Sequence, residues 1–221
     1  MIKTLKTKSK EQLLSLAYTL SFVTIIYNVL EGGISTFFGA EDETLALFGF
    51  GVDSFVEVIS GLGIAHMIFR MKKSDVDDRD KFEKRALKIT GTAFYVLTIG
   101  LVIGACLSIY SGQTPETTFI GIFVSSISIL TMYFLYRYKL ETGKLLDSAP
   151  IVSDANCTKT CFYLSFILLG SSLIYELFKV PYVDAIGSLG IAWYAFKEGK
   201  EAFEKVKTGN LSCSDDCDVC K

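Results

Sequence analysis

The chain has 221 residues, with 22 Lys and Arg against 24 Asp and Glu, which gives a formal net charge of −2. Without a basic excess, nothing favours a nucleic acid as partner. Half of the residues are hydrophobic, and they gather in blocks of about 20 residues, the length that crosses a hydrocarbon core of about 30 Å. The distribution predicts an integral membrane protein rather than a soluble domain.

The apolar blocks follow one another with short polar connections. We predict spans over residues 13–38, 45–69, 87–110, 117–138, 148–178 and 181–196. The fold class expected is an all-α membrane protein of six transmembrane helices. Residues 1–207 would form one transport domain, and residues 208–221 a Cys- and Asp-rich cytoplasmic tail without fixed structure.

Topology follows from the placement of Lys and Arg, which concentrate in cytoplasmic segments. Basic residues crowd the N-terminus, the connections after the second and fourth spans, and the segment after the sixth, whereas Lys179 alone lies in a connection on the other side. Both termini are therefore expected in the cytoplasm, which requires an even number of spans. We expect a multi-pass protein of the cell membrane.

Two carboxylates interrupt the second span. Asp53 and Glu57 are four residues apart, so they share one face of a helix and lie near the middle of the bilayer. Ionisable groups at that depth are costly and usually functional. We interpret this pair as half of a site for a cation.

Two cysteines, Cys157 and Cys161, have the same spacing in the fifth span. Since the second and fifth helices would run antiparallel, both pairs can meet at one depth. Two oxygens and two sulfurs match the needs of a tetrahedral metal site, although cysteines at this spacing can also simply pack in a helix. Thiolates favour soft ions, so Zn²⁺ or Cd²⁺ is the transported ion predicted.

These residues resemble those of the cation diffusion facilitators, a family of six-helix metal–proton antiporters. Asp53 and Glu57 match the family's acidic pair on helix two, and SDANCTKTC matches its helix-five pattern, with Asp154 as the leading Asp and Cys157 and Cys161 at the ligand positions. VPYVDAIGSLGIAWYAFKEG looks like the family's helix six. The resemblance covers 13–207 and implies efflux by proton antiport; the family's usual cytoplasmic C-terminal domain is expected to be absent.

Asp154 and the tail are weaker candidates for metal contact. Asp154 lies one turn before Cys157, where it could line the access path from the cytoplasm or favour the start of its helix as a carboxylate near the N-terminal dipole. The tail carries Cys213, Cys217 and Cys220 among aspartates. In the reducing cytoplasm these thiols would not form structural disulfides. We interpret them as a metal-capturing cluster; the alternative is a tail that has no specific function or that is redox-sensitive.

The expected partners are the lipid bilayer, metal ions and protons, with a homodimer as the assembly that the resemblance allows. We expect no permanently bound cofactor and no enzymatic activity. Two alternatives stay open. One is a membrane thiol oxidoreductase using Cys157 and Cys161, which leaves Asp53 and Glu57 without a role. The other is a metal-binding scaffold that does not transport.

Overall fold

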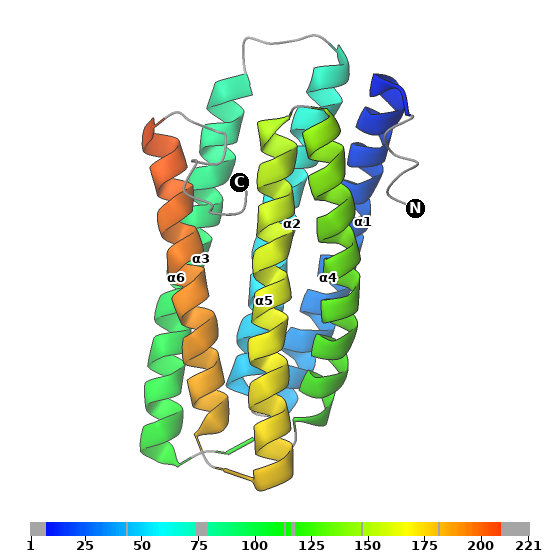
Figure 1. The fold of residues 1–221 in the computed structure, drawn as a ribbon. Helices are drawn as coiled ribbons and strands as arrows, with labels where there is room; N and C mark the ends of the chain where they lie inside the picture. Colours follow the sequence, from blue (N-terminus) through cyan, green and yellow to red (C-terminus); the bar gives the residue numbers. More distant parts are fainter. Residues whose placement is uncertain are drawn as a thin grey trace.

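The computed structural model of the chain describes residues 8–42, 44–73, 79–112, 114–115, 118–146, 148–180 and 182–208. Within these residues the fold is all-helical, as predicted. The helices are α1 (Lys10–Glu41), α2 (Leu45–Lys73), α3 (Arg79–Ser111), α4 (Phe119–Leu145), α5 (Ala149–Phe178) and α6 (Val183–Thr208). They form one elongated bundle (Figure 1).

Local sequence explains where some of these helices begin. The Ser9 hydroxyl accepts a hydrogen bond from the backbone N–H of Gln12, while the Gln12 side chain accepts one from the backbone N–H of Ser9. This reciprocal capping box satisfies two donors that the first turn of α1 would leave unpaired. At α5, Ser148 is extended and Pro150 occupies the first turn, where its missing N–H costs nothing.

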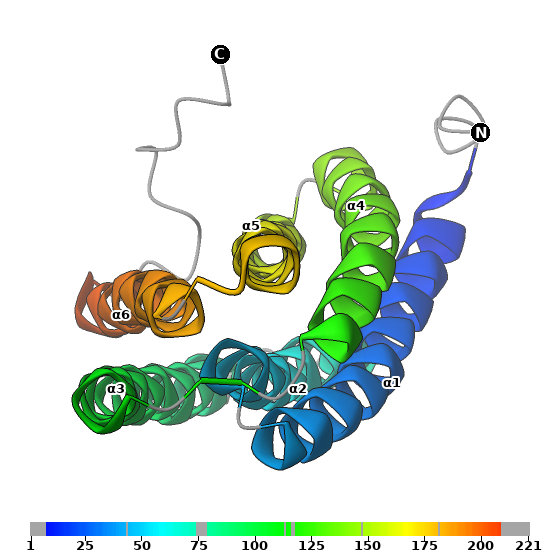
Figure 2. The same ribbon diagram turned by 90° about the horizontal axis from the view of Figure 1, so that it is seen from below.

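Helix α2 is the centre of the bundle. It packs against α1, α3, α5 and α6, while α4 packs mainly on α5, and α3 on α6. Viewed from below, α1, α2 and α3 form one curved row, and α5 and α6 lie across from it (Figure 2). Of the candidate membrane spans, α2 has the largest buried share. The polar side chains Asp53, Ser54 and Glu57 of this helix are buried inside the bundle.

Glycines bring α1 and α2 into backbone contact. A Cβ atom at Gly51 would lie 2.6 Å from the backbone nitrogen of Thr36, and one at Gly32 would lie 3.0 Å from the carbonyl oxygen of Gly51. Small residues permit such a close approach of two helices. Gly33 differs, because nothing lies within 4 Å of an added Cβ there.

Five of the described helices, α1 to α5, contain a window long and apolar enough to cross a membrane. Helix α6 is long enough, but only its first half is apolar, because Lys197, Glu198 and Lys200 follow. The start of α1 and the end of α6 lie at the same end of the bundle (Figure 1). This agrees with an even number of crossings, while α6 as the sixth span and the cytoplasmic side of that end stay predictions.

Asp184 of α6 caps the start of the central helix. Its carboxylate accepts hydrogen bonds from the backbone N–H groups of Leu45, at 2.8 Å, and Ala46, at 3.2 Å. These are first-turn donors that α2 cannot satisfy itself. The contact ties α6 to the helix that carries the acidic pair.

We expect Asp184→Ala to lower the free energy of unfolding by about 1–2 kcal/mol, the usual cost of losing an N-terminal cap. Asp184→Asn keeps one acceptor oxygen and should cost less. Thermal unfolding of the purified protein in detergent would rank the three proteins. Equal melting temperatures for Asp184→Ala and the wild type would show that the cap adds no stability.

Candidate metal centre

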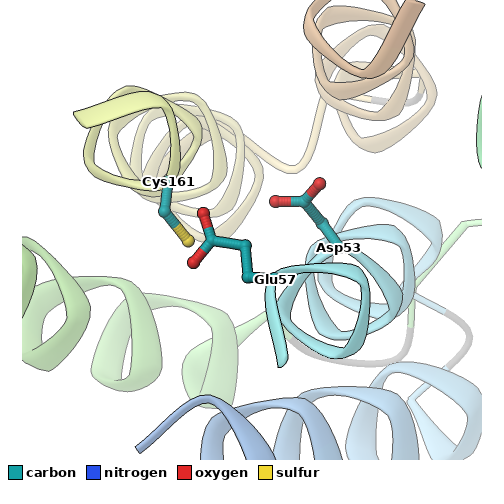
Figure 3. A group of neighbouring side chains, drawn as sticks. All are labelled: Asp53, Glu57 and Cys161. Atoms are coloured by element: carbon teal, nitrogen blue, oxygen red, sulfur yellow. The ribbon is translucent and has the colours of Figure 1, made fainter. Parts of the chain in front are cut away.

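Asp53 and Glu57 lie on the face of α2 that is turned toward α5. They are 2 % and 8 % exposed, respectively. Figure 3 shows both side chains leaving α2 one turn apart and pointing away from the helix axis into the bundle. The helical spacing, together with the central position of α2, thus buries two carboxylates side by side.

Cys161 brings a thiol to this acidic pair from α5. The residue is completely buried, and its sulfur points at the Glu57 carboxylate (Figure 3). One ligand atom from each of Asp53, Glu57 and Cys161 lies within 4.8 Å of the other two. Metal–ligand bonds of 2.0–2.3 Å would let one ion contact all three after small side-chain movements.

Cys157, the fourth predicted ligand, lies beside this compact group rather than within it. It is half-buried and lines a cavity of about 20 Å³ together with Asp53, Glu57, Thr160 and Glu198. A volume of this size accommodates one water-sized particle. The Thr160 hydroxyl donates to Glu198 at 2.9 Å, so α6 adds a third carboxylate to the surroundings of the site.

Helix α1 contributes two polar side chains to the surroundings of the acidic pair. The Asn28 amide Nδ2 donates to Glu57 Oε2 at 2.9 Å. One turn on, Glu31 accepts from the hydroxyls of Tyr27, at 2.8 Å, and Ser54, at 3.1 Å. Asn28 and Glu31 are both buried, so they belong to the interior around the acidic pair.

Comparisons with known proteins identify the family of the chain. The model of the cation efflux transmembrane domain matches residues 21–206. The chain belongs to the cation efflux family. The resemblance predicted from helices two, five and six is thereby confirmed, and the protein is a multi-pass protein of the plasma membrane in a family of cation transporters.

Two curated relatives share this membrane domain. The chain is 26 % identical over 194 residues to the manganese efflux system protein MneP of Bacillus subtilis, covering 82 % of this chain and 64 % of the relative. It is also 26 % identical over 174 residues to an uncharacterized transporter of Methanocaldococcus jannaschii, covering 77 % and 61 %. The chain thus spans slightly less than two thirds of the length of either relative.

Asp154, the weaker candidate of α5, is half of a buried ion pair. The Lys139 Nζ lies 2.9 Å from Asp154 Oδ2 and donates to the Thr158 hydroxyl at 3.1 Å. The predicted fourth span ends at residue 138, which leaves Lys139 in the connection that follows. In the structure α4 continues to Leu145, and Lys139 is buried against α5.

Breaking this pair should destabilise the protein, because an isolated buried charge is costly. We expect Lys139→Met to lower the free energy of unfolding by about 3–5 kcal/mol. The double variant Lys139→Met/Asp154→Leu removes both charges and should recover most of that loss. Chemical unfolding of the three proteins in detergent measures the difference. A double variant less stable than Lys139→Met would contradict a simple pairing role.

Among the cysteines that the structure describes, Cys161 is the one that belongs to the compact group. The tail cysteines Cys213, Cys217 and Cys220 lie outside the described residues. Cys106 is exposed on α3, and Lys159 lies over the ring of Tyr163. The thiol inside the compact group is therefore that of Cys161, with Cys157 next to it.

Proposed function

We propose that this protein exports a divalent metal ion through a site formed by Asp53, Glu57 and Cys161, with Cys157 beside it. The observation that carries the proposal is the placement of three ligand atoms within 4.8 Å of one another on the central helix and α5. Carboxylates buried at this depth in a membrane protein usually serve an ion pathway. Membership of the cation efflux family supports transport over storage.

The donor atoms support Zn²⁺ or Cd²⁺ as the transported ion. A buried thiol favours thiophilic metals, and two carboxylates keep the site from being purely soft. Mn²⁺ is the second candidate, favoured by the relative named as a manganese efflux protein and by the oxygen-rich surroundings that Glu31, Asn28 and Glu198 provide. A test of substrate must therefore include all three ions.

We further propose proton antiport with alternating access. Metal binding requires deprotonated ligands and so releases protons from Asp53, Glu57 and Cys161. A site that opens first to the cytoplasm and then to the outside would exchange metal for protons. In this scheme α6 is the sixth span, both termini are cytoplasmic, and a homodimer is an assembly to be tested by size measurement in detergent.

Reconstituted vesicles test this proposal. Purified protein in vesicles loaded with a metal-sensitive dye should admit Zn²⁺, Cd²⁺ or Mn²⁺, and a second dye should report proton movement in the opposite direction. Acidifying the side from which metal binds should slow uptake, because protons compete for the ligands. Metal uptake without proton movement would refute antiport, and no uptake of any of the three ions would refute the transporter.

The same vesicles separate the alternative functions. A thiol oxidoreductase would exchange disulfides through Cys157 and Cys161 without metal flux, and a scaffold would bind metal without flux. The four-residue spacing along α5 argues against a dithiol centre, as does the complete burial of Cys161. Capture of metal by Cys213, Cys217 and Cys220 is a separate proposal, supported by three thiols close together in sequence.

A further inference from the structure

We infer that Asn28 of α1 is a further ligand of the transported cation, and that its amide oxygen shifts the site toward oxygen-preferring ions such as Mn²⁺. The inference rests on the proposed function, because it assumes that the acidic pair binds the cargo. It adds a helix to the site, since the ligands predicted from the sequence all lie on α2 and α5.

The first step is the contact between Asn28 and a ligand carboxylate. Asn28 is completely buried, and its Nδ2 lies 2.9 Å from Glu57 Oε2. The amide is therefore aimed at one of the three groups that would hold the metal. Backbone contact between α1 and α2 at Gly51 keeps the two helices close together nearby.

The second step is the state of the amide oxygen. Asn28 Oδ1 is buried and accepts no hydrogen bond from any residue in the described part of the chain. The same holds for Oδ1 of Asp53. Buried polar atoms are nearly always paired, so each orphan calls for an explanation. Both orphans are acceptors, and a cation is a partner that satisfies acceptor oxygens.

The third step is the movement that would bring the oxygen to the metal. The terminal torsion of asparagine is broad and roughly two-fold. A half-turn of the amide would exchange its nitrogen and oxygen, so Oδ1 would take the place now held by Nδ2 next to Glu57. Without metal, the amide N–H donates to Glu57 Oε2; with metal, the carbonyl would join the same ion.

Two threonines on α1 behave differently from Asn28. The Thr24 hydroxyl donates to the backbone oxygen of Leu20, and that of Thr36 to the backbone oxygen of Gly32, so both bond within their own helix. Asn28 instead reaches across to α2. Carbonyl and carboxylate oxygens suit Mn²⁺, whereas thiolates suit Zn²⁺ and Cd²⁺. Adding one carbonyl should therefore favour Mn²⁺ more than Cd²⁺.

Metal titration of the full-length protein in detergent tests the inference. To remove competing thiols, every protein carries Cys213, Cys217 and Cys220 replaced by serine. Asn28→Leu should weaken Mn²⁺ binding at least about tenfold, the scale of losses seen on altering the surroundings of a metal, and Cd²⁺ binding by less than about threefold. Asn28→Asp restores an oxygen ligand and should bind Mn²⁺ at least as tightly as the parent. Thr24→Val, one turn away on α1, is the matched control.

Three results would overturn the inference. Asn28→Leu could bind Mn²⁺ within about threefold of the parent, below the range expected for a group at the metal. Its affinities for Mn²⁺ and Cd²⁺ could fall by the same factor, which would leave Asn28 as a group that only positions Glu57. If Asn28→Leu does not fold, a folded Asn28→Asp that fails to bind Mn²⁺ decides against it. Vesicle transport is scored separately: normal binding without flux would refute the proposed transporter and leave the ligand assignment standing.

Discussion

Asp53→Asn should abolish metal flux into vesicles while leaving the protein folded. Asparagine keeps the shape of the side chain but removes the negative charge from the buried group around Glu57 and Cys161. Changes outside the direct ligands of a metal already cost about 10- to 100-fold, so the loss of a charged ligand should exceed about 100-fold in metal affinity. Initial rates of uptake, with Zn²⁺, Cd²⁺ and Mn²⁺ in turn, give the direct measurement.

The control for this prediction is Glu41→Gln, which removes a carboxylate from the exposed end of α1. It should transport at the wild-type rate. Circular dichroism and melting temperature show whether Asp53→Asn is folded. A folded Asp53→Asn variant that still transports within a few-fold of wild type would remove Asp53 from the site.

Cys161→Ser should change which metal the protein prefers. The substitution replaces the one thiol inside the compact group by a hydroxyl, a harder and weaker ligand, so Cd²⁺ and Zn²⁺ should lose most. We expect Cd²⁺ affinity to fall by about 100-fold or more, because a direct ligand should cost at least as much as its surroundings. Mn²⁺ affinity should change little. Competition between Cd²⁺ and Mn²⁺ for uptake measures the preference in one experiment.

Cys106→Ser is the matched control, because Cys106 is exposed on the surface of α3. It should leave the ratio of Cd²⁺ to Mn²⁺ uptake unchanged. An unchanged ratio in Cys161→Ser would mean that the thiol does not touch the metal. The compact group would then consist of its two carboxylates alone.

Spacing and polarity were enough to predict which helices carry the site. Asp53 and Glu57 are conspicuous because charged groups are rare at membrane depth, and the four-residue spacing places each pair of candidates on one helical face. The structure brings Asp53, Glu57 and Cys161 together and leaves Cys157 beside them. Spacing alone does not distinguish these two cysteines, because they share one face of α5 and differ in their level along the helix axis, which depends on how α5 is placed against α2.

Long-range pairings could not be predicted in the same way. Lys139 follows the predicted end of the fourth span at residue 138, where a lysine usually lies at the membrane interface. Its pairing with Asp154 depends on how α4 packs on α5. Asp184 reaches the start of α2 from a helix almost 140 residues later in the chain. Asn28 carries no charge, so its position in α1 did not reveal its contact with Glu57.

X-ray absorption at the zinc edge tests the central claim most directly. The sample is the full-length protein with Cys213, Cys217 and Cys220 replaced by serine, loaded with one equivalent of Zn²⁺. We predict a first shell of oxygen at about 2.0 Å and sulfur at about 2.3 Å, and loss of a sulfur in the further variant Cys161→Ser. A shell without sulfur, or one that Cys161→Ser leaves unchanged, would contradict a metal site shared by α2 and α5.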